Sequence, residues 1–339
     1  MKLISYEALI IGESITFMYD KIHIPGVSLE RIPYALVSKI FLENIFFRNI
    51  GVKIKQEKID ETDGGWNYLK EKIDNNIPVL FKIDGRFLDN GNIERVNKFV
   101  NLQYLSTLLL VGYTNDKALV VLTNTDEKDM VTEINISDIQ KYRISKCNPI
   151  SPDGLCYYLD NYSGIEKVTD KKIKESLFLG LRNITNTMLN DKEECVSLGS
   201  FEGIGTSFGV NGIRNLRRDL VEMKTSINFD NKLQYNFVKL VIAFVRNNMM
   251  YGSYSAFRME FGQGLITCAN KYKIKELDMI GNDFKDIGLH WQKLFRILTS
   301  IIHDKGIFND KYNNVINLID EISIREEKQF KYINKILFI

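Results

Sequence analysis

The sequence predicts an α+β protein in which a mixed first half, residues 1–150, is followed by a mainly helical second half, residues 151–339. Before residue 144, short apolar runs with strand periodicity alternate with amphipathic helices. Beyond residue 156, apolar residues recur at steps of three and four, which is typical of helices. The stretch 144–156, "ISKCNPISPDGLC", holds two of the five prolines and marks the boundary between the halves.

Four stretches of the first half carry clear element signals. "YALVSKIFLENIFFRN" (34–49) spaces its apolar residues as a helix does, and Gly51 is well placed to end that helix. "GVKIKQEKI" (51–59) alternates as a strand does. "GWNYLKEKIDNN" (65–76) predicts a short helix that leads into the strand "IPVLFKID", where Pro78 fits only at the start. Two further strands are expected at 105–113 and 118–124.

The second half is read as a series of helices joined by loops. The glycine run "GSFEGIGTSFGVNG" (199–212) does not meet the GxGxxG pattern of a dinucleotide site, and no strand precedes it. We therefore expect an interhelical loop there, capped by Asn211. The expected helices are 170–189, 212–224, 231–250, 255–272, 282–304 and 310–336.

Composition excludes several functional classes. Among 339 residues, 45 Lys and Arg face 43 Asp and Glu, so a net charge of +2 gives no reason to expect nucleic acid or a membrane as partner. No apolar run is long enough to span a bilayer, and "ALIIGESITFM" is broken by Glu13 and lacks a cleavage site. The four cysteines form no CxxC pair and no metal-ligand spacing, so we expect a cytoplasmic protein without metal or cofactor.

The nucleophile and base candidates have weak local signals. His290 and His303 lie in amphipathic helices and are interpreted as packed or solvated side chains. His23 lies in a loop where it can meet a ligand, although nothing nearby would orient it as a base. Cys147 and Cys156 flank the proline-containing stretch without a partner that would lower a thiol pKa, so inert thiols are favoured.

One arginine is placed unusually among apolar residues. "FRMEFGQG" (257–264) predicts that Arg258 is buried with a carboxylate partner such as Glu260. The alternative is that Arg258 holds an anionic ligand.

Several stretches, taken in order, resemble the butirosin biosynthesis H-like family. "YEALIIGESITFMY" (6–19) is similar to that family's segment of a Glu, a glycine turn and an aromatic pair, and "STLLLVGYTNDKALVVLTN" (106–124) to its central pair of strands. The resemblance covers nearly the whole chain. The other stretches that carry it are 65–88, 208–220 and 251–261.

The resemblance implies a papain-like, cysteine-peptidase-like N-terminal domain and a helical C-terminal domain. Family members resemble acyltransferases that move an acyl group from the thioester of an acyl carrier protein to an amine in antibiotic and other natural-product biosynthesis. That chemistry needs a cysteine nucleophile on an N-terminal helix, a histidine base at the start of the central strand and an Asp or Asn that orients the histidine.

This chain departs from the family's pattern at the nucleophile and at the base. Only five residues precede Tyr6 and none of them is Cys, so we expect the nucleophile helix to be lacking, unless an upstream segment or a partner chain supplies it. The histidine position holds Ser106, or Thr107 if the register shifts by one, while Asn124 takes the orienting position. Loss of a general base removes a factor of about 10²–10⁴ in rate.

We therefore expect a catalytically degenerate family member that binds a carrier protein, a peptide or a pathway enzyme. The alternative is an active acyltransferase with a rebuilt site. Backbone N–H groups of the turn at Gly12–Ser14 could face an oxyanion, although Glu13 there disfavours negative charge. The apolar end "FKYINKILFI" is expected to be buried either in the chain's own core or against a second subunit in a homodimer. The residues expected to line the site are Glu13, Ser14, Tyr19, Asp84, Ser106 and Asn124.

Overall fold

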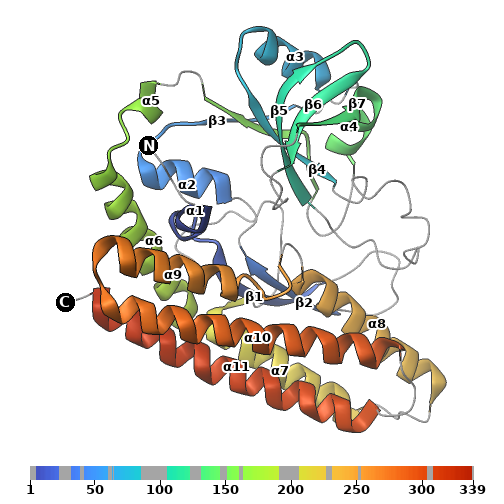
Figure 1. Ribbon diagram of the computed structural model, residues 1–339. Coiled ribbons are helices and arrows are strands. Elements are labelled where there is room, and N and C mark those ends of the chain that lie inside the picture. The colour runs from blue at the N-terminus through green and yellow to red at the C-terminus, as the bar shows by residue number, and fades with distance from the viewer. Residues whose placement is uncertain are drawn as a thin grey trace. The chain divides into compact units, whose positions relative to one another are not determined.

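The computed structural model divides the chain into two compact units, and each is described here by itself (Figure 1). The helical unit comprises residues 1–50, 168–198 and 202–339, and the sheet unit comprises 51–167 and 199–201. Helices and two antiparallel sheets together make the α+β class that the sequence predicts. The structure describes residues 5–22, 32–38, 42–59, 63, 65–84, 105–122, 131–145, 151–159, 163–190, 206–226, 231–250, 253–303 and 308–337.

The helical unit is built around a small antiparallel sheet with the strand order β2-β1-β9. Residues 15–20 of the central strand β1 (Ile15–Ile22) are buried, with α7 packed against β1 and α8 packed against β2. Helices α10 and α11 run side by side along this unit (Figure 1). Its other elements are α1 (Ser5–Ile11), β2 (Ile32–Ser38), α2 (Leu42–Ile50), α6 (Asp170–Asn190), β9 (Ser207–Phe208), α7 (Gly209–Ser226), α8 (Lys232–Met249), α9 (Arg258–Tyr272), α10 (Lys275–His303) and α11 (Phe308–Leu337).

The expectation of one helix over 34–49 is wrong. Residues 32–38 form β2, which pairs with β1, and the helix that the structure describes comprises 42–50. A short apolar run such as "YALV" fits a buried strand as well as a helix, and pairing with β1 decides between them. The end of the helix is as predicted, since Gly51 has a φ of +77° and follows α2 directly.

The sheet unit holds a six-stranded antiparallel sheet with the order β3-β8-β4-β5-β6-β7. The helix and the strand expected at 65–84 and the strands expected at 105–113 and 118–124 are confirmed up to residue 122, and residues 123–124 lie outside the described residues. Against expectation, the stretch 144–156 is not only a linker, because β8 pairs with both β3 and β4. The elements are β3 (Lys55–Lys58), α3 (Trp66–Asp74), β4 (Val79–Asp84), β5 (Leu105–Tyr113), β6 (Lys117–Leu122), β7 (Val131–Asn135), α4 (Ile136–Arg143), β8 (Leu155–Tyr158) and α5 (Ser163–Glu166).

The register between β4 and β5 decides which side chains share a face of the sheet. Phe81 pairs with Leu108, and both belong to the apolar core that includes Trp66 of α3. The next pair in the register, Lys82 with Thr107, therefore lies on the opposite face.

The compact units do not follow the boundary at residue 150 that divides 1–150 from 151–339 in the sequence analysis. Residues 1–50 join the helices of the second half, since β1 and β2 pack against α7 and α8. Those contacts join segments about 200 residues apart in sequence, as in the hydrogen bond from Tyr19 to Asp219. Local periodicity carries no information about such pairing.

The helix expected from 212 begins at Gly209, directly after β9, so Asn211 is not its cap. Gly209 has a φ of +58°, and an added Cβ would lie 2.3 Å from the carbonyl oxygen of Met188. The rest of the glycine run, 199–205, lies outside the described residues.

Candidate functional site

The six residues expected to line one site are divided between the two units. Glu13, Ser14 and Tyr19 belong to the helical unit, whereas Asp84 and Ser106 belong to the sheet unit. Asn124, the expected orienting residue, lies outside the described residues.

In the sheet unit, the expected base position lies at the start of β5. Ser106 pairs with Ile83 of β4 and is 8 % exposed. Its neighbour Thr107 is half-buried and faces the other side of the sheet, where its Oγ1 accepts a hydrogen bond from Lys82 Nζ at 2.7 Å. The position where the resemblance leads us to expect an imidazole base therefore holds two hydroxyl groups, one of them hydrogen-bonded to a lysine.

Lys82 is the residue that sequence reasoning missed. Its side chain is 2 % exposed, and its Nζ lies 5.9 Å from the centre of the Tyr157 ring. Asp84, two residues further along β4, is fully buried and accepts a hydrogen bond from Ser145 Oγ at 3.0 Å. The signal was present in "FKID", because charged residues at alternate positions of a buried strand lie on one face.

In the helical unit, the turn at Gly12–Ser14 keeps its own backbone donors. The N–H groups of Gly12, Glu13 and Ser14 donate to the carbonyl oxygens of Ala8, Ile10 and Leu9. These groups are thus used within the chain, and the expectation that they face an oxyanion is wrong.

Glu13 is not a surface turn residue, since it is 2 % exposed and has a φ of +54°. Its Oε1 accepts hydrogen bonds from Asn49 Nδ2 at 3.1 Å and Asn183 Nδ2 at 2.6 Å. The carboxylate therefore ties the turn to α2 and α6, a contact that offsets the strain of the left-handed backbone. Ser14 is also buried beside it.

Tyr19 joins β1 to α7. Its hydroxyl donates to Asp219 Oδ2, which also pairs with Lys21 Nζ at 2.9 Å. Burial, and next the bond to Asp219, raise the pKa of Tyr19 well above its ordinary value, so the phenol stays protonated. This arrangement fixes the strand and gives Tyr19 no role as a base.

The two cysteines that the structure describes are poor nucleophiles. Cys156 is fully buried in β8, and burial raises the pKa of its thiol to about 11. Cys268 in α9 is also fully buried, and desolvation raises its pKa to about 12. Both values agree with the expectation of an inert thiol at Cys156. Cys147, Cys195 and His23 lie outside the described residues.

The described histidines lie on α10, as expected for helix residues. His290 is half-buried, with its Nε2 3.0 Å from Glu321 Oε1. Neither described cysteine forms an ion pair or hydrogen bond with it in the contacts found.

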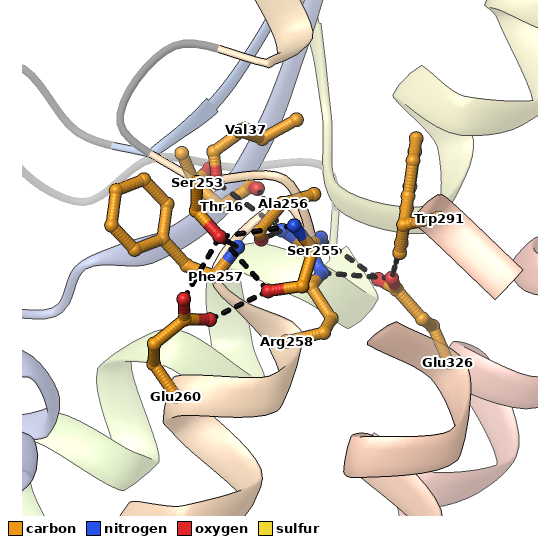
Figure 2. Close-up of polar contacts among 10 residues, drawn as sticks. All are labelled: Thr16, Val37, Ser253, Ser255, Ala256, Phe257, Arg258, Glu260, Trp291 and Glu326. Carbon is orange, nitrogen blue, oxygen red and sulfur yellow. Dashed lines mark hydrogen bonds and ion pairs between the residues drawn. The ribbon is translucent and has the colours of Figure 1, made fainter. Parts of the chain in front are cut away.

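Arg258 belongs to a fully buried polar cluster of the helical unit (Figure 2). Its expected burial with a carboxylate is confirmed, but the partner is Glu326 of α11, with Nε–Oε1 at 2.8 Å and Nη2–Oε2 at 3.0 Å. Nη1 donates to the carbonyl oxygens of Thr16, Val37 and Ala256. Because these protein groups take up its donors, Arg258 is a structural clamp and does not hold an anionic ligand.

Glu260, the partner that the sequence suggested, accepts hydrogen bonds from two serine hydroxyls instead. Ser253 Oγ lies 3.0 Å from Oε1 and Ser255 Oγ 2.6 Å from Oε2 (Figure 2). These bonds hold the residues before α9, where Ala256 and Phe257 both have positive φ.

Among the described residues, no group of His, Cys, Asp and Glu has the arrangement of a metal site. None of the helices within the described ranges is both long and apolar enough to cross a membrane. Comparison with protein-family models found no match, and neither did comparison with curated proteins. What the chain does is therefore inferred from its own residues and their contacts.

Proposed function

We propose that the chain is a cytoplasmic, catalytically degenerate relative of the butirosin biosynthesis H-like proteins. In this proposal it has a papain-like sheet region and binds a carrier protein, a peptide or a pathway enzyme in natural-product biosynthesis. The resemblance of several stretches, which follow one another in the family's order, suggests the family. The side chains at the expected base position suggest the loss of catalysis.

The observation that carries the proposal is the hydrogen bond from Lys82 Nζ to Thr107 Oγ1 at the start of β5. In this contact the lysine nitrogen donates and the hydroxyl oxygen accepts, so the pair is not arranged as a base that receives the hydroxyl proton. Neither Ser106 nor Thr107 provides the basic nitrogen that activates a thiol in a Cys–His pair.

Two further observations support a binding role. Burial raises the thiol pKa of Cys156 and of Cys268, so neither is a thiolate near neutral pH. The N–H groups of the turn at Gly12–Ser14 are bonded within the chain and are not aimed at a developing oxyanion.

One observation favours the alternative, an active acyltransferase with a rebuilt site. The Thr107 hydroxyl lies within hydrogen-bond distance of a lysine, and a hydroxyl beside a neutral lysine is a known nucleophile–base arrangement. In that mechanism Lys82 would take the Thr107 proton, the oxygen would attack the thioester carbonyl, and the carrier thiol would leave with the proton.

The two functions are separated by incubating the full chain with acyl-loaded carrier proteins from the same source. We expect complex formation in native mass spectrometry and no covalent gain in intact mass. A mass gain equal to the acyl group that disappears in Thr107→Val and Lys82→Met would establish the alternative. Failure of the chain to bind carrier proteins, precursor peptides and pathway enzymes would contradict the binding role.

A further inference from the structure

The solvent-facing side of α6 combines apolar and basic side chains in one stripe. Lys171, Lys174, Phe178 and Arg182 follow one another at i, i+3, i+7 and i+11, which places them along one face of the helix. Leu179 lies beside them and is 39 % exposed. The other face of α6 is packed into the core of the helical unit through residues such as Leu177 and Leu181.

The surface of this stripe contains a depression. Lys174, Glu175, Phe178, Leu179 and Arg182 line an open depression of about 310 Å³. Tyr272 of α9 adjoins the stripe, with its ring centre 6.3 Å from that of Phe178 and 5.4 Å from Lys174 Nζ. A depression of this size accommodates one or two apolar side chains between cationic groups.

Most of the charged side chains near the N-terminus of α6 are basic and oppose its dipole. Thr169 Oγ1 accepts from the N–H of Lys172 at the beginning of the helix, where acidic side chains are stabilising and basic ones are not. Asp170 in the first turn meets this preference, but it is followed by the three lysines Lys171, Lys172 and Lys174. Carboxylates supplied from outside would both pair with these lysines and interact favourably with the helix N-terminus.

We propose that this α6 surface docks an acidic amphipathic helix of a partner protein, which inserts an apolar side chain into the depression. The basic side chains of this stripe alternate with the apolar Phe178 and Leu179 and with the acidic Glu175, so the surface is not the continuous basic track that a phosphate backbone or lipid headgroups require. A partner helix with apolar side chains on one face and a few carboxylates beside them complements the surface better than nucleic acid or lipid does.

This inference rests on the proposed binding function, for which it names the docking surface and the chemistry of the partner. The probes are three synthetic helical peptides of about 18 residues, a length at which an isolated helix can form. The first has a leucine face and a glutamate face, the second replaces its glutamates with lysines, and the third replaces its leucines with serines. Their affinities for the full chain are measured by titration calorimetry.

We expect only the leucine–glutamate peptide to bind, and its affinity to fall as salt screens the exposed charges. The double variant Lys174→Glu/Leu179→Ser should weaken this binding by roughly tenfold or more, as expected for anchor residues of an interface. Lys232→Glu/Leu233→Ser on α8 is the matched control, because both side chains are exposed and the chemical changes are the same. That control should alter the affinity by less than about twofold.

Equal binding by both double variants, or binding of the lysine peptide, would overturn the docking surface. The same would follow if anionic vesicles or single-stranded RNA bound with dependence on Lys174. The proposed function has a separate readout in the carrier, peptide and pathway-enzyme binding described above. If such a partner binds wild type and the α6 variant equally, the docking surface is wrong and the proposed function stands. If the leucine–glutamate peptide binds but no carrier protein, precursor peptide or pathway enzyme does, the docking surface stands and the proposed function is wrong.

Discussion

Arg258 and Glu326 illustrate how single residues hold the helical unit together. Both side chains are fully buried, and the Glu326 carboxylate also accepts a hydrogen bond from Trp291 Nε1 at 2.8 Å. Arg258 additionally bonds carbonyl oxygens of β1 and β2, so one side chain connects both strands with α9 and α11. Burying such a pair costs desolvation, and removal of one partner leaves the other charge uncompensated.

Arg258→Met should lower the free energy of unfolding of the helical unit by about 3–5 kcal/mol, because Glu326 would remain as a buried, unpaired carboxylate. Urea unfolding followed by Trp291 fluorescence, in a Trp66→Phe background, measures this loss; these are the two tryptophans of the chain.

Arg214→Met serves as the control for Arg258→Met. Arg214 pairs with Glu327, the neighbour of Glu326, but its side chain is 43 % exposed. Such a surface pair contributes at most about 1 kcal/mol. Similar losses for the two variants would contradict the role of burial.

At the scale of elements, α9 and α10 approach each other through glycines. An added Cβ on Gly281 would lie 2.6 Å from the carbonyl oxygen of Gly262, and one on Gly262 would lie 2.4 Å from that of Gly281. Glycine inside a helix costs about 1 kcal/mol relative to alanine, so its presence here reflects close packing. The glycines of "FGQGL" in the sequence indicate such close packing, but they do not indicate which helix packs against them.

Gly281→Ala should destabilise the helical unit by about 1–3 kcal/mol, although the same change in an exposed helix would stabilise it, because the backbones of α9 and α10 must separate. The same fluorescence-monitored urea titration measures it. Asn282→Ala, at the next and exposed position of α10, should change stability by less than about 0.5 kcal/mol. A stabilised Gly281→Ala protein would show that the two helices are free to move apart.

Long helices were predictable because their periodicity is sustained. The expected helix at 231–250 agrees with α8 within one residue at each end, and Asn231 Oδ1 accepts from the N–H groups of Leu233 and Gln234 as an N-cap does. Short elements depended on partners far away in sequence. β2 was mistaken for helix and β9 for loop, since only their pairing with β1 identifies them as strands.

At the scale of the whole molecule, the sheet unit is nearly continuous in sequence and the helical unit is not. All six strands of the larger sheet lie between residues 51 and 167, whereas the helical unit needs residues 1–50 and the second half of the chain. An expected site that drew residues from both units, such as Glu13 and Asp84, could not be tested by periodicity. Local patterns placed each residue on its element but carried no information on which elements belong together.

A fragment of residues 51–167 should fold by itself, whereas a fragment of residues 151–339 should not. The second fragment lacks β1 and β2, which cover apolar faces of α7 and α8 and supply carbonyl partners to Arg258. Cooperative thermal unfolding by circular dichroism distinguishes the two. Supplying residues 1–50 in trans should restore cooperativity to the second fragment, and a sharp transition without them would refute this division.

The discontinuity of the helical unit has a consequence during protein synthesis. Strands β1 and β2 leave the ribosome well before Glu326, which completes the Arg258 cluster, is made. At roughly 5–20 residues per second, the strands wait on the order of 15–60 s for that partner. The sheet unit can fold on the nascent chain in the meantime, while the apolar first fifty residues remain a target for chaperones until the last helix emerges.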